Sequence, residues 1–324
     1  MILKKTLQKL PPMNLVAKYV QAVFLLIPWC VLLMEGGAVS QKSEPTPQHI
    51  IQYPAASQGT DPHQGIQMGA EADTYVPGFL PEALSKVDLL KVRAGVQSVP
   101  RIRLARLPVH RPGQRLHPNS QKDLFLKTML PMILQVNEQI LSERSRVLEI
   151  MAQGLQKNGS QRKGLTRAER AWLTAIANRY KVSRHDIPEL LLRMDILPPS
   201  LALAQGIDES GWGKSHGAAR KNSPFGQRVR TGNSHQYQLQ HFNTLFEAVQ
   251  SYAHNLNTHP AYSNLRHIRK TLRQRGAQIR GHDLAPGLVK YSELGPMYVQ
   301  KVRTIIVQNH LSQFDTTSLE FSRP

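Results

Sequence analysis

The chain has 324 residues, with 41 Lys and Arg against 22 Asp and Glu, which gives a formal net charge of +19. This length accommodates one domain of about 200 residues with extra segments, or two small domains. Such a basic balance indicates an anionic partner: nucleic acid, an anionic membrane or an acidic cell-wall polymer. No zinc-finger spacing, RNP-type aromatic run or phosphate-binding loop supports nucleic acid. The single cysteine, Cys30, excludes an intramolecular disulfide and a cysteine-rich metal site.

The first forty residues resemble a secretory signal. Lysines at positions 4, 5, 9 and 18 precede an uncharged run, Tyr19–Met34, and the small-x-small triplet Ala38-Val39-Ser40 follows. The uncharged run is shorter than the roughly 20 residues that span a bilayer, and Pro28 interrupts it. We therefore predict a signal peptide over residues 1–40, with an uncleaved membrane anchor as the alternative. Either reading predicts export to the periplasm or cell envelope, and the anchor would tether the protein to the inner membrane.

A proline-rich segment follows the signal. Ten prolines lie between Gln41 and Pro118, among many Gln, Ser and Gly residues. Prolines at this density are incompatible with helix interiors and central strands. We predict a largely disordered linker over residues 41–115, in which one apolar patch, Phe79–Gly95, is a candidate for a short helix.

Apolar residues at intervals of three and four predict ordered helices from about Asn119. The first helix is expected over 119–153, with a kink at Pro131. A second is expected over Leu165–Val182, where Thr166 and Glu169 have the spacing of a capping box. Further helices are predicted over 186–197, with Pro188 in the first turn, from Ser200 to about Glu209, and over 244–256, 264–276, 283–291 and 297–311.

Between Phe225 and Phe242, polar and apolar residues alternate on both sides of Thr-Gly-Asn-Ser, which predicts a β-hairpin. Helices around one small hairpin make an α+β domain. We assign this domain to residues 116–315 and a short tail to residues 316–324.

The stretch Leu201–Gly226 carries the main chemical signal. The predicted helix ends at a carboxylate, Glu209, and the glycines of Gly211-Trp212-Gly213 suit the turn that terminates it. The negative end of the helix dipole disfavours an ionised carboxylate, and water exclusion by Trp212 would act in the same direction. A carboxylic acid that stays protonated near neutral pH can protonate the leaving oxygen of a glycosidic bond. From the residues alone, a surface glutamate at a helix end remains the alternative.

Four segments in order resemble the bacterial peptidoglycan β-N-acetylglucosaminidases of the FlgJ-like glycoside hydrolase family 73. "LAQGIDESGWGKS" is similar to the family's AQ-x-x-x-ESGWG-K/R-S signature, and "NSPFG" to its N-x-FG element with one extra residue. "FNTLFEAVQSYAHNLNTHPAYSNLR" resembles the Bax-type branch of the family. "LVKYSELGPMYVQKVRTII" resembles the Y-A-T-D/S-x-x-Y-x-x-K-I block, so that the likeness covers roughly residues 119–315.

The resemblance implies a lysozyme-like fold with a small β-hairpin lobe, and cleavage of the β-1,4 bond after N-acetylglucosamine in peptidoglycan glycan strands. It implies that Glu209 is the catalytic acid and that Tyr291 is the tyrosine of the catalytic site. The residues at positions that shape the substrate cleft are Ser210, Trp212, Asn222, Phe225, Gly226 and Tyr298. For the aromatic residues a packing role is the alternative, and for Asn222 a turn.

The sequence departs from the family pattern at two points. Asp208 precedes Glu209, where it would either raise the pKa of the acid further or be exposed and idle. In addition, no Asp or Glu occurs between Ser210 and Phe246, where the second carboxylate of a paired mechanism would be expected. We therefore predict that Glu209 acts as the single acid, while the sugar's 2-acetamido group or a water assisted by Tyr291 attacks the anomeric carbon.

Other functions remain open from the sequence. A lytic transglycosylase or muramidase would use the same fold, although the chain lacks a GLMQ-like element after Glu209. A cell-wall amidase and a non-catalytic wall-binding protein are more distant alternatives. None of the 13 histidines shows a metal-ligand spacing, so neither a metal nor another cofactor is expected.

Overall fold

The structure is a computed structural model that describes residues 81–108, 118–155, 157–158, 161–162, 164–230 and 236–321. The chain divides into two units, Met1–Thr46 and Pro47–Pro324, and every described residue belongs to the second. The expected signal or anchor, most of the expected linker and the Thr-Gly-Asn-Ser turn lie outside the described residues.

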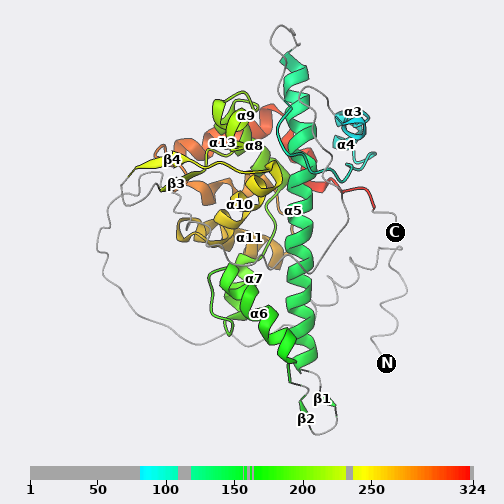
Figure 1. The fold of residues 1–324 in the computed structure, drawn as a ribbon, viewed down its shortest axis with the longest axis vertical. Helices are drawn as coiled ribbons and strands as arrows, with labels where there is room; N and C mark the ends of the chain where they lie inside the picture. The colour runs from blue at the N-terminus through cyan, green and yellow to red at the C-terminus, as the bar shows by residue number, and fades with distance from the viewer. Residues whose placement is uncertain are drawn as a thin grey trace. The chain divides into compact units, whose positions relative to one another are not determined.

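The predicted mostly helical α+β fold is confirmed (Figure 1). Its α-helices are α3 (Glu82–Ser85), α4 (Leu89–Arg93), α5 (Pro118–Leu155), α6 (Arg167–Arg179), α7 (Ile187–Arg193), α8 (Pro199–Ser210), α9 (His216–Lys221), α10 (Leu245–Thr258), α11 (Ser263–Gln274), α12 (Gly281–Leu284) and α13 (Pro296–Gln308). The 3-10 helices are η2 (Pro260–Tyr262), η3 (Ala285–Leu288) and η4 (Leu311–Thr316). Two antiparallel pairs of strands complete the described part: β1 (Lys157–Asn158) with β2 (Gln161–Arg162), and β3 (Arg228–Arg230) with β4 (Tyr237–Leu239).

Local sequence signals account for several helix ends. Thr166 and Glu169 form the predicted capping box at the start of α6. Helix α5 continues through Pro131 as one 38-residue helix.

The sequence did not predict α9, the β1–β2 pair or the 3-10 helices η2 and η4, because each is too short to show a periodic pattern. Within the described ranges, no helix combines the length and apolar character needed to cross a bilayer.

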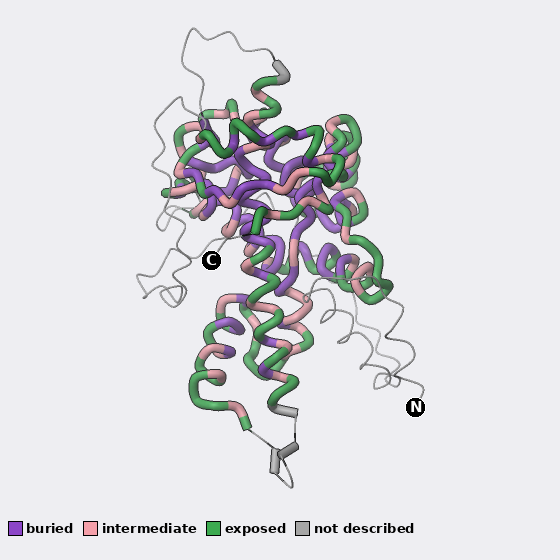
Figure 2. Tube along the Cα trace, turned by 90° about the vertical axis from the view of Figure 1, so that its right-hand side faces the viewer, coloured by how far each residue is buried: buried purple, intermediate pink, exposed green. Residues whose placement is uncertain are grey.

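Helix α8 forms the centre of the core. Its residues from Pro199 to Ile207 are all buried, and α5, α12, α13 and η4 pack around it. In Figure 1, α5 is the long upright helix, and it has α8 and α10 on one flank and α3 and α4 on the other. In Figure 2, buried residues gather in the upper part of the tube, whereas the lower part, with the end of α5 and α6, carries many exposed and intermediate residues. The core therefore holds α8 from all sides.

A buried ion network fixes the connection from α7 to α8. Arg269 of α11 is fully buried and donates to the carbonyl oxygens of Asp195 (3.0 Å) and Ile196 (2.8 Å). Arg273 binds the Asp195 carboxylate, which is 3% exposed. The carboxylate of Asp315 in η4 then accepts the backbone N–H of Ser200, at 2.8 Å. Charged groups satisfied in this way hold the start of α8 in one orientation.

Residues 81–108 are folded, although they lie in the segment for which the sequence predicts a largely disordered linker. The β-bridge of Val99 with Leu319 joins this segment to the C-terminal tail, and Gln135 of α5 donates to the carbonyl of Ile102 (2.9 Å). The prediction of a linker rested on the number of prolines and did not take account of the apolar side chains of this segment. Eight of them are buried in the core: Leu84, Val87, Leu89, Val92, Val99, Ile102, Leu104 and Leu107. The folded body thus begins before the expected boundary at residue 116, and it includes part of the 316–324 tail.

We predict that a chain of residues 116–324 is much less stable than a chain of residues 81–324. Each buried aliphatic side chain contributes about 1.5–3 kcal/mol, so the loss of the N-terminal segment costs several kcal/mol even after residual burial in the unfolded state is allowed for. Thermal unfolding followed by circular dichroism measures the difference. Equal midpoints for the two chains would show that the segment only rests on the surface.

Candidate active site

Glu209 lies in the last turn of α8, where the helix leaves the core. Gly211 follows in the left-handed conformation (φ 57°), and its N–H closes the helix on the carbonyl of Ile207. The hydroxyl of Ser210 donates to the carbonyl of Gly206 (2.5 Å) and accepts the N–H of Gly213 (2.9 Å). Ser210 is 1% exposed, so the structure places it as part of the helix end rather than on an open surface.

A pocket of about 690 Å³ opens beside this helix end. The turn over residues 223–226 and Leu239 of β4 line part of it, together with six polar residues: Glu209, Ser215, His216, Arg228, Tyr291 and Glu293. Of the residues proposed from the sequence, the structure brings Glu209, Phe225, Gly226 and Tyr291 together around this pocket. Ser210, Trp212, Asn222 and Tyr298 are not among its lining residues.

Gly226 allows the chain to approach the carboxyl group of Glu209. Its backbone has a φ of +63°, and a Cβ atom built on it would lie 2.8 Å from Oε2 of Glu209. The neighbouring Phe225 is buried and stacks on Tyr252 of α10 at 4.0 Å. Its carbonyl accepts the hydroxyl of Tyr291 at 3.3 Å. The turn at residues 225–226 therefore contacts both proposed catalytic residues.

The environment of Glu209 favours its protonated form. Burial, and next the neighbouring charge of Asp208, raise its pKa to about 7, whereas Lys301 and Arg228 act in the opposite direction. Asp208 is not idle, because its carboxylate pairs with the Lys301 ammonium of α13 at 2.5 Å. The helix C-terminus adds a negative potential of its own. The arrangement thus supplies a carboxylic acid that can deliver a proton near neutral pH.

The two tyrosines occupy different places. Tyr291 lines the pocket and is 3% exposed, and its ring stacks on that of Tyr298 at 5.2 Å. The hydroxyl of Tyr298 accepts a hydrogen bond from Gln205 of α8 (3.1 Å), and Tyr252 donates to the same Gln205 side chain (2.6 Å). Tyr298 therefore lies one layer behind the pocket, where it supports Tyr291 and α8.

Asn222 serves the architecture of the site. It ends α9 in the left-handed conformation (φ 49°), a backbone state that asparagine tolerates. Its side-chain amide donates to the carbonyls of Ala105 and Phe242, both at 3.0 Å. Asn222 thus links α9, the end of the hairpin and the N-terminal segment.

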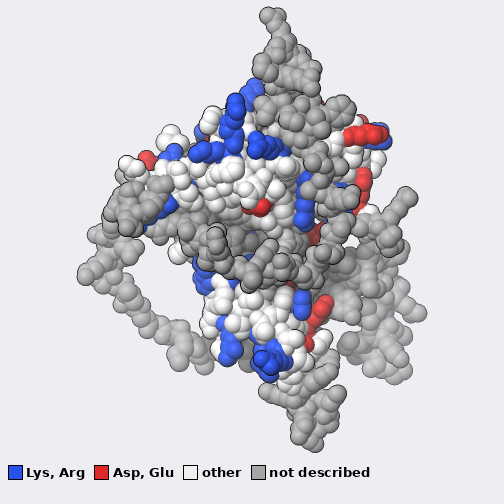
Figure 3. Space-filling view, viewed as in Figure 1, with Lys and Arg blue, Asp and Glu red and all other residues white. Residues whose placement is uncertain are grey.

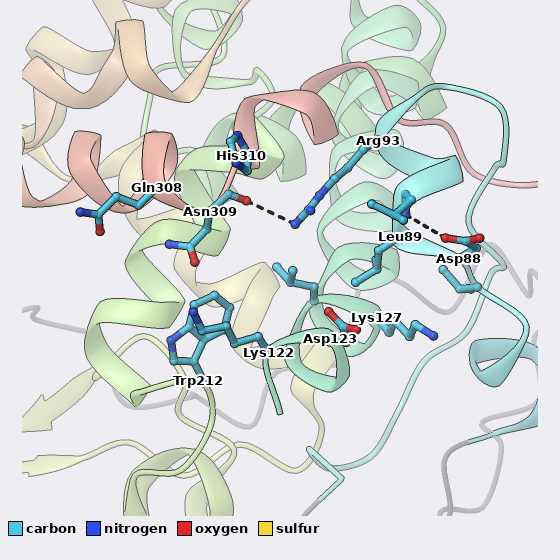
Figure 4. A pocket seen from close by; sticks show the side chains of 13 residues that line it. Asp88, Leu89, Arg93, Lys122, Asp123, Lys127, Trp212, Gln308, Asn309 and His310 are labelled. Atoms are coloured by element: carbon cyan, nitrogen blue, oxygen red, sulfur yellow. Dashed lines mark hydrogen bonds between the residues drawn. The ribbon is translucent and has the colours of Figure 1, made fainter. Parts of the chain in front are cut away.

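Trp212 lines a different pocket, of about 590 Å³, which Figure 4 shows between α4, the start of α5 and the end of α13. Its carbonyl accepts a hydrogen bond from Gln121 (2.9 Å), and the ammonium of Lys122 lies 5.1 Å from its ring centroid. Its ring also packs edge-on against Phe125. The structure thus places Trp212 over the start of α5, away from the lining of the Glu209 pocket.

Of the lining residues that the sequence-based set lacks, three carry a titratable or charged side chain: His216, Arg228 and Glu293. Glu293 could have been proposed from the sequence, since it lies two residues after Tyr291 in the segment that resembles the family. His216 begins the unexpected helix α9, and no sequence pattern pointed to it as a site residue. Arg228 belongs to a basic surface: on the face in Figure 3, Lys and Arg side chains gather over α9, α13 and the hairpin.

We predict that Glu209 titrates near pH 7 and that its two charged neighbours shift it in opposite directions. Asp208→Asn removes a negative charge and releases Lys301, so the pKa of Glu209 falls; Lys301→Met removes the opposing cation, so the pKa rises. Carboxyl ¹³C NMR of the labelled protein measures both shifts. Lys270→Met, at an exposed position of α11, removes one positive charge as Lys301→Met does and is expected to leave the pKa of Glu209 unchanged. A Glu209 titration near 4 in the unsubstituted protein would contradict the prediction.

Comparisons with known proteins identify the family of the chain. The sequence model of the glucosaminidase family, described as mannosyl-glycoprotein endo-beta-N-acetylglucosaminidase, matches residues 185–311. The chain is 34% identical over 200 residues to Protein bax of Escherichia coli (strain K12), which covers 58% of this chain and 70% of that relative. No solved structure gives a significant match. The chain belongs to the glucosaminidase family, in its Bax-type branch within glycoside hydrolase family 73, and is a glycoside hydrolase that acts on peptidoglycan.

Proposed function

We propose that this enzyme cleaves the β-1,4 bond after N-acetylglucosamine in peptidoglycan, with Glu209 as the single general acid. One observation carries the proposal: Glu209, with a pKa raised to about 7, lines a pocket large enough for a sugar ring. The close approach of Gly226 holds the carboxyl group at the pocket wall. A protonated carboxyl in this position can deliver its proton to the oxygen that leaves the anomeric carbon.

The remaining site residues have supporting functions in this proposal. Tyr291 anchors the turn at residues 225–226 through its hydroxyl and lines the pocket, where in this proposal it orients the attacking group. Tyr298 and Asn222 hold this wall in place from behind, and Ser210 ends the helix that carries the acid. Trp212 would contact substrate only where the glycan or its peptide extends to the second pocket. The attack itself comes from the 2-acetamido group or from water.

The basic surface suits the polymer. Lys214, Arg220, Arg228 and Arg230 are exposed on α9, on the turn before it and on β3. Cations in these positions attract the lactyl and peptide carboxylates of peptidoglycan, and this attraction weakens as salt is added. An enzyme that acts on this polymer works in the cell envelope. We infer that residues 1–40 direct its export, as their charge pattern indicates.

The reaction products test the proposal. Sacculi digested with the enzyme are expected to release new reducing ends of N-acetylglucosamine. Glu209→Gln, which keeps the shape of the side chain but has no proton to give, is expected to lower the rate by at least about 100-fold. Reduction with borohydride followed by mass spectrometry identifies the ends. Reducing muramic acid would indicate a muramidase, and 1,6-anhydro-muramic acid a lytic transglycosylase. A fully active Glu209→Gln variant would remove Glu209 from the chemistry.

Gly226 is predicted to be essential for the position of the acid. Gly226→Ala places a methyl group 2.8 Å from Oε2 of Glu209, so the carboxyl must move and the turnover rate is expected to fall by about 10-fold or more. Gly276→Ala is the matched control, because Gly276 has a similar φ of +64° but nothing within 4 Å of the added atom. Both variants should lose stability from the strain of an alanine at positive φ. Equal activity in the two would show that Gly226 does not position Glu209.

A further inference from the structure

When water attacks the anomeric carbon, a general base must accept its proton, and Tyr291 is poorly suited to be that base. Its hydroxyl donates to the carbonyl of Phe225, and burial raises its pKa well above the ordinary value. A phenol that retains its proton can orient a water by a hydrogen bond, but it does not remove a proton from it. If water attacks, the base must be another group at the pocket.

Glu293 is the carboxylate that the structure brings to the pocket beside Glu209. Among the described lining residues these two are the only Asp or Glu side chains. Asp208 is excluded because it is paired with Lys301 and does not line the pocket. The hairpin lobe supplies no alternative, since the sequence has no Asp or Glu between Ser210 and Phe246.

The chain around Glu293 is held by a tight turn. The N–H of Gly295 binds the carbonyl of Ser292 at 2.9 Å, and the N–H of Leu294 binds the Ser292 hydroxyl at 3.3 Å. Tyr291 before the turn and Tyr298 after it stack on one another, so both ends of the turn are anchored in the core. Glu293 itself is exposed, so water can reach its carboxylate.

We propose that Glu293 is the general base of this enzyme, an inference that rests on the proposed function of the same pocket. Water attacks the anomeric carbon while its proton passes to the Glu293 carboxylate. The bond from that carbon to the leaving oxygen breaks, and the leaving oxygen takes the proton of Glu209. One water is consumed; Glu293 then returns its proton to solvent and Glu209 regains one. A single displacement by water inverts the anomeric configuration.

Two other mechanisms would not use Glu293, and each leads to a different experimental outcome. His216 also lines the pocket and is exposed, at the first turn of α9. It would place the base on the hairpin side of the pocket and make Glu293 dispensable. Attack by the substrate's own 2-acetamido group needs no separate base for water in its first step, and it retains the anomeric configuration.

The test uses the full chain with soluble glycan strands. Glu293→Gln is expected to lower kcat by about 100-fold, with a much smaller effect on KM, because it removes the base but keeps a polar side chain. Glu149→Gln, an exposed carboxylate of α5 outside the pocket, is the control and is expected to keep full activity. Azide, which needs no base, is expected to restore turnover to Glu293→Ala and to give the α-glycosyl azide. The first product of the unsubstituted enzyme is expected to be the α-anomer by NMR.

The possible failures can be told apart. Full activity of Glu293→Gln, loss of activity in His216→Gln instead, absence of azide rescue, or a β-anomer as first product would each overturn the assignment of Glu293. In all of these cases N-acetylglucosamine reducing ends would still be released. An unsubstituted enzyme that releases none of them would instead overturn the proposed function.

Discussion

Helix α8 is buried from Pro199 to Ile207, and this burial determines where its carboxylates can lie. A largely apolar helix that is buried on every side must be surrounded by protein, and here α5, α12, α13 and η4 surround it. Only its last turn reaches the pocket, so Glu209 is half-buried in the core and half-open to solvent. The raised pKa of Glu209 is a direct consequence of this position, because burial contributes most to it.

The two ends of α8 are secured by different means. At the start, the Asp195–Arg269–Arg273 network and Asp315 hold the backbone by charged hydrogen bonds. At the end, left-handed Gly211 and the Ser210 hydroxyl terminate the helix. The acid therefore sits on a rigid element, as precise proton transfer requires. The wall facing it is built from a loop, but the Phe225–Tyr252 stack and the Tyr291 hydroxyl restrain that loop.

Segments distant in the sequence cooperate in building the wall. Asn222 binds the carbonyl of Ala105, so the N-terminal segment contacts the catalytic lobe directly. The same segment joins the tail through the bridge of Val99 with Leu319. Composition predicted linker here because prolines dominate the local pattern. The prolines are nevertheless compatible with the extended and short helical pieces that the structure shows, whose apolar side chains are buried.

The sequence by itself determined most of the α-helices, the hairpin, the capping box at Thr166 and the position of Glu209 at a helix end, since these follow from periodicity and from local turn chemistry. It also indicated the family, through four segments within residues 203–226, 242–266 and 288–306. Only the tertiary structure decided which residues share the pocket. It joined Glu209, Gly226 and Tyr291 with Glu293 and placed Trp212 in another pocket. The physical reason is that side-chain neighbours across separate elements depend on packing around α8, which no local pattern records.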